Sequence, residues 1–137
     1  MRFTPYAQGD SRWSNLQLGS SGLLMQTSGC YVTALASIWN KLPSVVLEAF
    51  NKNGCFTPEG ALDNAKVAQV MGLIYAKVTQ DPKKMCVMET NHYAPHNPQH
   101  FVVWVGDGKY IMDTTDGKIK LNPYHPISFR LWDNRHG

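Results

Sequence analysis

Apolar residues recur at helical spacing in the first half of the chain. The clearest case is residues 30–40, where the apolar positions fall three or four apart, at Val32, Leu35, Ala36 and Trp39. This spacing predicts a helix, and either Thr27 or Ser28 could cap its first turn. The 27 residues before it are rich in Gly, Ser, Asn and Gln, and we expect an ordered but irregular arm with one short helix.

Two further helices are predicted by their start and stop signals. Pro43 suits the first turn of a helix that reaches about residue 50. Thr57 followed by Pro58 is typical of a cap and a first-turn proline, and predicts a helix that ends at Gly72.

The second half of the chain changes to a strand-like pattern. β-Branched and aromatic residues on either side of Asp107-Gly108 predict a hairpin within residues 100–115. Further strands are expected at 73–78, 85–90, 118–121 and 127–132. Helices followed by antiparallel strands indicate an α+β fold, and the length of 137 residues indicates a single domain over 1–137.

The composition argues against a disordered chain, a nucleic-acid-binding protein and a membrane-spanning protein. Hydrophobic residues at 43% and charged residues at 17% indicate a folded globule rather than a disordered chain. The net charge of +3 is spread along the sequence, so no basic stripe predicts nucleic-acid binding. The sequence begins without an apolar leader and no apolar run is long enough to span a membrane, so we expect synthesis in a cytoplasm. Association with a phage virion, or release to a cell wall, is compatible with this pattern.

The cysteine pattern predicts one reactive thiol. Three cysteines without CxxC spacing do not suggest a disulfide framework, and Cys55 and Cys86 are expected to be core thiols. Cys30 falls at the first turn of its predicted helix, where unpaired N–H groups and the helix dipole stabilise a thiolate. That placement suits a nucleophile. The alternative is a small buried residue at a helix start.

The hairpin can bring a base and a carboxylate together. If Asp107 and Gly108 are the central turn residues, Asp113 faces Val102 and lies diagonal to His100 on the same face of the ribbon. The carboxylate could then orient the imidazole toward Cys30, as in a catalytic triad. A three-residue loop would instead place Asp113 on the opposite face.

Four segments in order resemble the C39-like branch of the papain-fold cysteine peptidases, which occur in bacteria, phage genomes and phage lysins. They are YAQGDSRWSNLQLG, SGCYVTALASIWNKLP, NGCFTPEGALDNAKVAQVMGL and HFVVWVGDGKYIMDTTDG. The resemblance implies a papain-like fold, with N-terminal helices packed on a C-terminal antiparallel sheet. It also implies hydrolysis of a peptide or amide bond through an acyl-enzyme, with no cofactor or metal. We expect a monomer that acts on a peptide or on peptidoglycan.

The resemblance also implies roles for individual residues. It assigns the nucleophile, the general base and acid, and the orienting carboxylate, in that order, to Cys30, His100 and Asp113. Gln8 resembles the glutamine whose amide helps to form the oxyanion hole, and Gln26 is the alternative donor. Asp116 competes with Asp113 for the third position of the triad.

Other residues have weaker signals. Candidate substrate-binding residues are Trp13, Gly29, His92 and Gln99. Trp13 could instead pack under the arm, and His92 could lie on a solvated loop. The histidines at 92, 96 and 100 share a spacing of four, but intervening prolines disfavour the regular helix that a zinc site on one helix face would need.

Two other functions use the same features. The fold could serve as a peptide-binding or virion structural module without chemistry. The same triad could also transfer an acyl group to an amine instead of to water.

Overall fold

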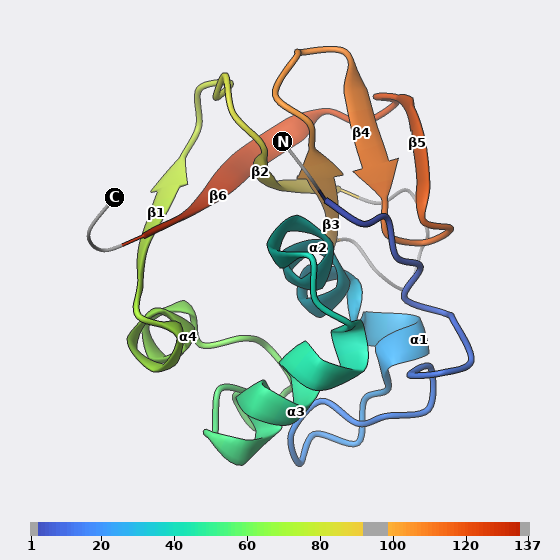
Figure 1. Ribbon diagram of the computed structural model, residues 1–137, viewed down its shortest axis with the longest axis vertical. Helices are drawn as coiled ribbons and strands as arrows, with labels where there is room; N and C mark the ends of the chain where they lie inside the picture. Colours follow the sequence, from blue (N-terminus) through green and yellow to red (C-terminus); the bar gives the residue numbers. More distant parts are fainter. Residues whose placement is uncertain (1–2, 92–98, 135–137) are drawn as a thin grey trace.

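The structure is a computed structural model, and it describes residues 3–91 and 99–134. Its helices come first along the chain, at Met25–Ser28 (α1), Cys30–Trp39 (α2), Pro43–Lys52 (α3) and Asn64–Met71 (α4). The strands follow, at Leu73–Val78 (β1), Cys86–Asn91 (β2), Gln99–Trp104 (β3), Tyr110–Asp113 (β4), Lys118–Leu121 (β5) and Pro126–Asn134 (β6). The α+β class predicted from the sequence is therefore confirmed (Figure 1).

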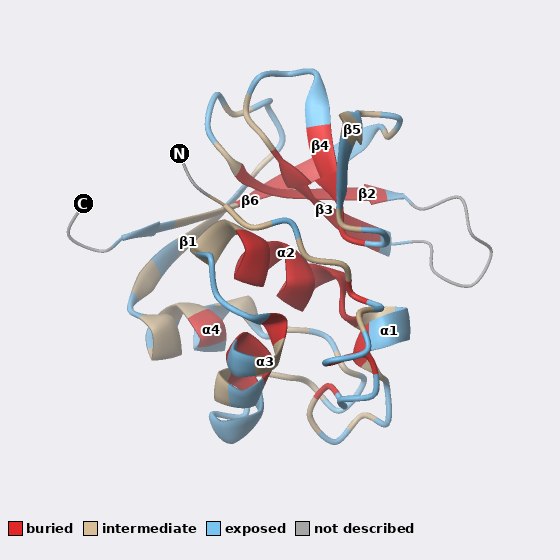
Figure 2. Cartoon of the chain, turned by 45° about the vertical axis from the view of Figure 1, so that its right-hand side comes forward, coloured by how far each residue is buried: buried red, intermediate tan, exposed pale blue. Residues whose placement is uncertain are grey.

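The strands form one antiparallel sheet in the order β1-β6-β2-β3-β4-β5. The last strand, β6, crosses back to lie between β1 and β2, so the sheet is not a simple meander. The helices lie on one side of the sheet, and α2 packs directly against β2 and β3 (Figures 1 and 2). Among the described residues, no helix is both long and apolar enough to cross a membrane.

Along the central strands, successive apolar side chains belong alternately to two buried clusters. The cluster that contains α2 takes Val87, Phe101, Val103 and Met112 from the sheet. The other cluster takes the alternate positions Cys86, Met88, Val102, Trp104 and Ile111, together with Phe129. Since successive side chains of a strand point to opposite faces, this pattern means that the central strands are covered on both sides. Helix α2 is buried along most of its length (Figure 2).

The predicted third helix starts later than expected. Residues 57–62 form a turn in which the Thr57 side chain accepts a hydrogen bond from the N–H of Ala61, and Phe56 bridges to Leu62. Helix α4 begins only at Asn64, where the Asp63 side chain accepts from the N–H of Lys66. The local Thr-Pro signal is thus overridden by a better capping residue six positions along.

The predicted hairpin register is confirmed. Val103 pairs with Met112 and Trp104 pairs with Ile111, so Asp113 falls opposite Val102. Beyond the paired strands, the Thr114 hydroxyl donates to the carbonyl of Phe101 over 2.7 Å. This bond fixes the end of β4 beside the beginning of β3, where His100 lies.

The N-terminal arm is ordered and is tied to the sheet. The N–H of Gln8 donates to the carbonyl of Thr114 over 2.8 Å, next to the β4–β5 turn. Gly117 in that turn has φ +71°, and an added Cβ would lie only 3.0 Å from the backbone of Ala7. Glycine therefore permits the close approach that brings Gln8 to the end of β4.

Candidate active site

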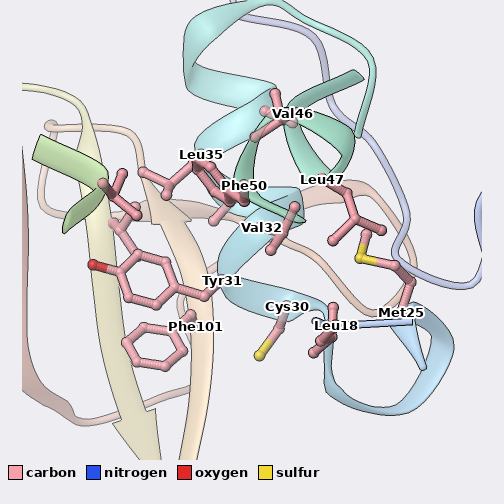
Figure 3. Close-up of a cluster of buried hydrophobic side chains, with 14 of the residues drawn as sticks. Leu18, Met25, Cys30, Tyr31, Val32, Leu35, Val46, Leu47, Phe50 and Phe101 are labelled. Carbon is pink, nitrogen blue, oxygen red and sulfur yellow. The ribbon is translucent and has the colours of Figure 1, made fainter. Parts of the chain in front are cut away.

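Cys30 is the first residue of α2, and the chain reaches it through a tightly packed glycine. A Cβ at Gly29 would lie 2.5 Å from the Met25 sulfur and 2.7 Å from the Met25 carbonyl oxygen, so no other residue fits without rearrangement. No side chain caps α2. The first N–H groups of a helix have no partner within the helix, so this end of α2 offers hydrogen-bond donors beside the thiol. Figure 3 shows Cys30 at this first turn, within the apolar cluster around α2.

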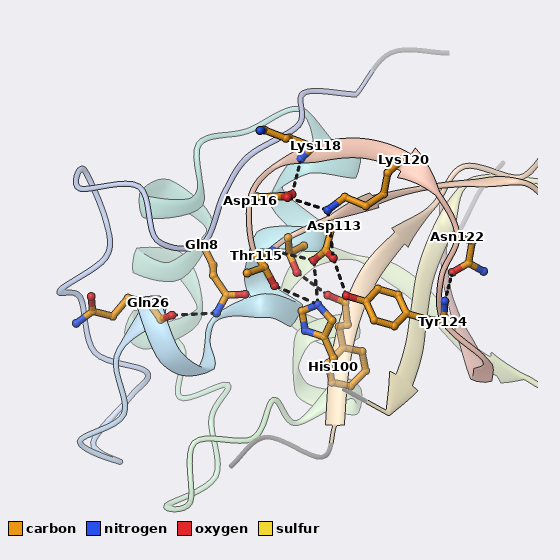
Figure 4. A network of polar contacts seen from close by, with 12 residues as sticks. Gln8, Gln26, His100, Asp113, Thr115, Asp116, Lys118, Lys120, Asn122 and Tyr124 are labelled. Atoms are coloured by element: carbon orange, nitrogen blue, oxygen red, sulfur yellow. Dashed lines mark hydrogen bonds and ion pairs between the residues drawn. The ribbon is translucent and has the colours of Figure 1, made fainter. Parts of the chain in front are cut away.

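His100 and Asp113 form the contact that the hairpin register predicts. The Nε2 atom of His100 donates to Asp113 Oδ1 over 3.0 Å, and both side chains are almost fully buried (Figure 4). The Cys30 side chain lies close enough to His100 to help raise the pKa of the imidazole. Because Nε2 is taken up by the carboxylate, Nδ1 is the ring nitrogen that remains for Cys30. The imidazole therefore interacts with both the carboxylate and the thiol.

Further groups hold Asp113 in place. The Tyr124 hydroxyl donates to Asp113 Oδ2 over 2.7 Å, and the N–H of Thr115 donates to Asp113 Oδ1 over 3.0 Å. Lys120 Nζ lies 3.8 Å from Asp113 Oδ2. Burial alone would raise the pKa of Asp113, but the hydrogen bonds from His100, Tyr124 and Thr115 outweigh it and lower that pKa. Asp113 is a carboxylate at any pH near neutrality.

The His100 imidazole is shifted toward its charged form. Burial by itself would lower its pKa, but the hydrogen bonds and negative charges of Asp113 and Cys30 more than compensate. The result is a pKa of about 9. At neutral pH the site therefore favours an imidazolium, the state that pairs with a thiolate and can protonate a leaving group.

Gln8 is buried at the same site. Its side-chain nitrogen donates to the carbonyl oxygen of Gln26 over 3.1 Å (Figure 4). It also donates to the carbonyl oxygen of Met25, over 3.4 Å. Its Oε1 atom is buried and has no hydrogen-bond partner within the described residues. An unpaired buried amide oxygen is unusual, and it shows that within the described residues the side-chain amide of Gln8 is held through its nitrogen alone.

The geometry distinguishes the alternatives that the sequence leaves open. The Gln26 side chain is exposed and points away from His100 in Figure 4, so of the two glutamines only Gln8 has its amide in the site. Asp116 is also exposed, and it pairs with Lys120 over 2.7 Å instead of with His100. Asp113 is the carboxylate that contacts the imidazole.

The other two cysteines have different surroundings. Cys55 and Cys86 are buried and form no disulfide. Burial raises the pKa of Cys86 to about 12 and also raises that of Cys55. Neither thiol is linked to an imidazole in the described structure, so both are expected to react slowly.

A cavity of about 380 Å³ opens beside the thiol. Its lining includes Cys30, Asn64 and Arg130. On its floor the rings of Tyr31 and Phe101 stack, with centroids 4.3 Å apart (Figure 3). A group bound in this cavity would lie next to the Cys30 thiol.

The remaining candidate residues are placed as follows. Trp13 is 1% exposed and its indole N–H donates to the carbonyl of Ala7, so it packs under the arm and does not line the cavity. Gly29 is buried and serves the packing of α1 against α2. Gln99 lines the cavity beside Cys30. His92 lies outside the described residues, as does His96, and the described part contains no cluster of three metal-ligating side chains.

Sequence reasoning missed the groups that support Asp113. Tyr124 lies in the loop between β5 and β6, and its ring also meets that of His100 edge-on, with centroids 5.7 Å apart. Thr115 is two residues after Asp113, and its hydroxyl oxygen is 3.4 Å from His100 Nε2. The proximity of Thr115 to Asp113 was a local signal, whereas nothing local points to Tyr124.

Comparisons with known proteins give no relative. No protein-family model, no curated protein sequence and no solved structure matches the chain. A function must therefore be argued from the site itself.

Proposed function

We propose that this protein is a papain-like cysteine hydrolase of the C39-like type that cleaves a peptide or related amide bond. The observation that carries the proposal is His100, which bonds to a buried carboxylate through Nε2 and whose pKa is also raised by the neighbouring Cys30 side chain. A nucleophile, a base and an orienting group in this order are what acyl transfer through a thiol requires.

In the proposed mechanism the Cys30 sulfur attacks the carbonyl carbon of the scissile amide. A new S–C bond forms and the carbonyl oxygen becomes an oxyanion. His100, as imidazolium, gives its Nδ1 proton to the leaving amine as the C–N bond breaks. Its neutral form then takes a proton from water, which attacks the thioester and releases the acyl group. Asp113 keeps the ring oriented throughout, through Nε2.

The oxyanion is stabilised by two donors in this proposal. The first is the backbone N–H of Cys30 at the start of α2. The second is Gln8, whose longer bond to Met25, at 3.4 Å, is the weaker of its two and can be exchanged for a bond to the oxyanion. A stem peptide or cross-bridge of peptidoglycan is the substrate that the family resemblance suggests.

The test is to replace Cys30 with Ala and to measure the release of new amino groups from purified cell walls. We expect hydrolysis to be abolished and the melting temperature to stay near that of the unchanged protein. The matched control is Cys86→Ala, which removes a buried thiol from outside the site and should keep activity. Hydrolysis that survives in the Cys30→Ala protein would show that the nucleophile is wrongly assigned.

Thiol labelling separates an enzyme from an inactive module. Iodoacetamide applied across a range of pH should modify Cys30 well below the pH at which Cys55 and Cys86 react. Equal, slow reaction at all three sites would favour a binding or structural module. Adding a competing amine to the cell-wall assay separates hydrolysis from acyl transfer, since only a transferase would form the new amide as its main product.

A further inference from the structure

The cavity beside Cys30 has an apolar wall and a polar edge. Its wall is formed by side chains from the arm, from α2 and from the turn before α4, namely Leu18, Leu23, Val32, Phe56 and Leu62. The polar edge includes Glu59 at the rim and Gln99 next to His100. The apolar wall favours binding of an apolar group, and the polar residues at the edge determine which polar groups of the same ligand can bind beside it.

Gln99 is held in one orientation by a buried carboxylate. Its Nε2 donates to Glu89 Oε2 over 2.7 Å. The pKa of Glu89 is about 2, because hydrogen bonds from Ser128, Gln99 and Arg130 outweigh the opposing effect of burial. An ionised carboxylate only accepts hydrogen bonds, so the amide of Gln99 cannot turn round. Its Oε1 atom is therefore the one left for a ligand, as an acceptor.

The positive charge that lines the cavity, that of Arg130, is already neutralised. Arg130 Nη2 lies 2.6 Å from Glu89 Oε1, and the same guanidinium donates to Ser128 and to Tyr75. The charged residues lining the cavity are Arg130 and Glu59, and Glu59 is exposed at the rim without an ion pair among the described residues. The local balance is negative, although the whole chain carries a net charge of +3.

We propose that this cavity selects the substrate: it binds an apolar side chain next to the scissile amide, and Gln99 Oε1 accepts an N–H from the same segment. The carboxylate of Glu59 makes neutral or cationic segments favoured and acidic segments disfavoured. The proposal rests on the proposed function, because the cavity matters only if the bound segment presents its carbonyl to Cys30. It adds a substrate class: apolar, non-acidic peptide segments.

The experiment uses N-substituted iodoacetamides, which react by forming an S–CH₂ bond to the Cys30 thiolate and releasing iodide. Their substituents are n-hexyl, 5-aminopentyl and 5-carboxypentyl, and every rate is divided by that of the same reagent with glutathione. Relative to iodoacetamide, the hexyl reagent should label Cys30 roughly tenfold faster, as burial of about two methylene groups implies. The aminopentyl reagent should exceed the carboxypentyl reagent by about fivefold.

Three variants assign these effects to the cavity. Ala61 lines the cavity and is exposed, so Ala61→Trp should fill the space, abolish the hexyl advantage and leave the folded state intact. Glu59→Lys should reverse the order of the amino and carboxy reagents, whereas the matched control Glu48→Lys, at an exposed position of α3, should not. An N-methyl-N-hexyl reagent lacks the amide N–H and should label Cys30 a few-fold more slowly than the N-hexyl reagent does. In the Gln99→Leu protein, which lacks the acceptor, the two reagents should label at the same relative rate.

The outcomes separate the two proposals. If Cys30 reacts rapidly with iodoacetamide but all substituents give the same relative rate, the cavity does not select the substrate and the proposed hydrolase stands. The same conclusion follows if Ala61→Trp and Glu59→Lys change nothing. If Cys30 is no faster than Cys55 and Cys86 toward iodoacetamide itself, the proposed function falls and this inference falls with it.

Discussion

Two buried carboxylates on the same sheet have very different partners. Asp113 faces an imidazole, a phenol and a backbone N–H, whereas Glu89 faces a guanidinium, a hydroxyl and an amide. Both have lowered pKa values, because hydrogen bonds outweigh the effect of burial in each case. We refer to them as the Asp113 cluster and the Glu89 cluster.

The difference lies in whether the partner can exchange a proton. Arg130 stays charged at every pH at which the protein folds, so the Glu89 cluster is a fixed ion pair. His100 can gain and lose a proton, with a pKa of about 9 that is raised in part by the neighbouring Cys30 side chain. Similar burial and bonding can thus support structure in one place and chemistry in another. The predictions below test whether this separation holds.

The largest effect is expected from Asp113→Asn. The amide keeps the size of the side chain but removes the charge that favours the imidazolium and the correct tautomer. We expect the rate of amide hydrolysis to fall by roughly 10³–10⁴-fold, with the free energy of unfolding changed far less. Cell-wall hydrolysis and chemical denaturation of the same preparation measure both. A rate within tenfold of the unchanged protein would mean that Asp113 is only structural.

The second largest effect is expected in the Glu89 cluster, where a substitution should lower stability. Glu89→Ala leaves the Arg130 charge buried without its partner, and should lower the free energy of unfolding by about 3–5 kcal/mol. Replacing both residues, as Glu89→Ala with Arg130→Met, should recover much of that loss. Denaturant titrations of the two variants test this. A single variant as stable as the unchanged protein would show that the ion pair contributes nothing.

The sequence predicted the elements whose signals are local. The helix from Cys30, the helix from Pro43 and the strands at 73–78 and 118–121 follow from spacing and from punctuating residues. The start of α4 was wrong, because the turn at residues 57–62 is set by contacts across it. The position of β6 between β1 and β2 has no local signal at all, since it depends on pairing between strands far apart in the chain.

In the candidate site, too, the sequence predicted the contact that depends on neighbouring segments and missed those that depend on distant ones. His100 and Asp113 could be placed together because one hairpin determines their register. Tyr124 could not, because its contact with Asp113 depends on the path of the loop before β6. The Glu89–Arg130 pair was missed for the same reason: it joins β2 to β6, whose adjacency appears only in the assembled sheet.

A third prediction concerns pH and follows from the raised pKa of His100. Above about pH 9 the ring loses the proton that the leaving amine needs, so hydrolysis should fall as the pH rises through this value. Alkylation of Cys30 by iodoacetamide needs only the thiolate and should not fall. Parallel pH profiles of hydrolysis and alkylation make the comparison. A decline of both together would point to unfolding instead of His100.

His100 and Glu89 should also lose their contributions to stability at opposite ends of the pH range. A raised histidine pKa contributes stability below the unfolded value near 6.5, and this is lost as the pH rises through about 9. The lowered pKa of Glu89 contributes above its unfolded value near 4.5, and this is lost as the pH falls toward 2. The lowered pKa of Asp113 also contributes stability that is lost at acid pH. Denaturation of the Asp113→Asn variant across acid pH therefore measures the loss of stability that is due to Glu89.

The smallest effect is expected from Tyr124→Phe, which keeps the ring against His100 and removes only the hydroxyl that donates to Asp113 Oδ2. Loss of one hydrogen bond to a charged group corresponds to about 1.5–3 kcal/mol at most, so hydrolysis should fall by roughly ten- to a hundredfold. A carboxylate that has lost one of its three hydrogen-bond donors in the described structure is held less firmly against the imidazolium, so the alkaline decline should also move to lower pH. A purely structural tyrosine would change stability and leave that pH unchanged. The matched control is Tyr110→Phe, an exposed tyrosine on β4, which should alter neither the rate nor the profile.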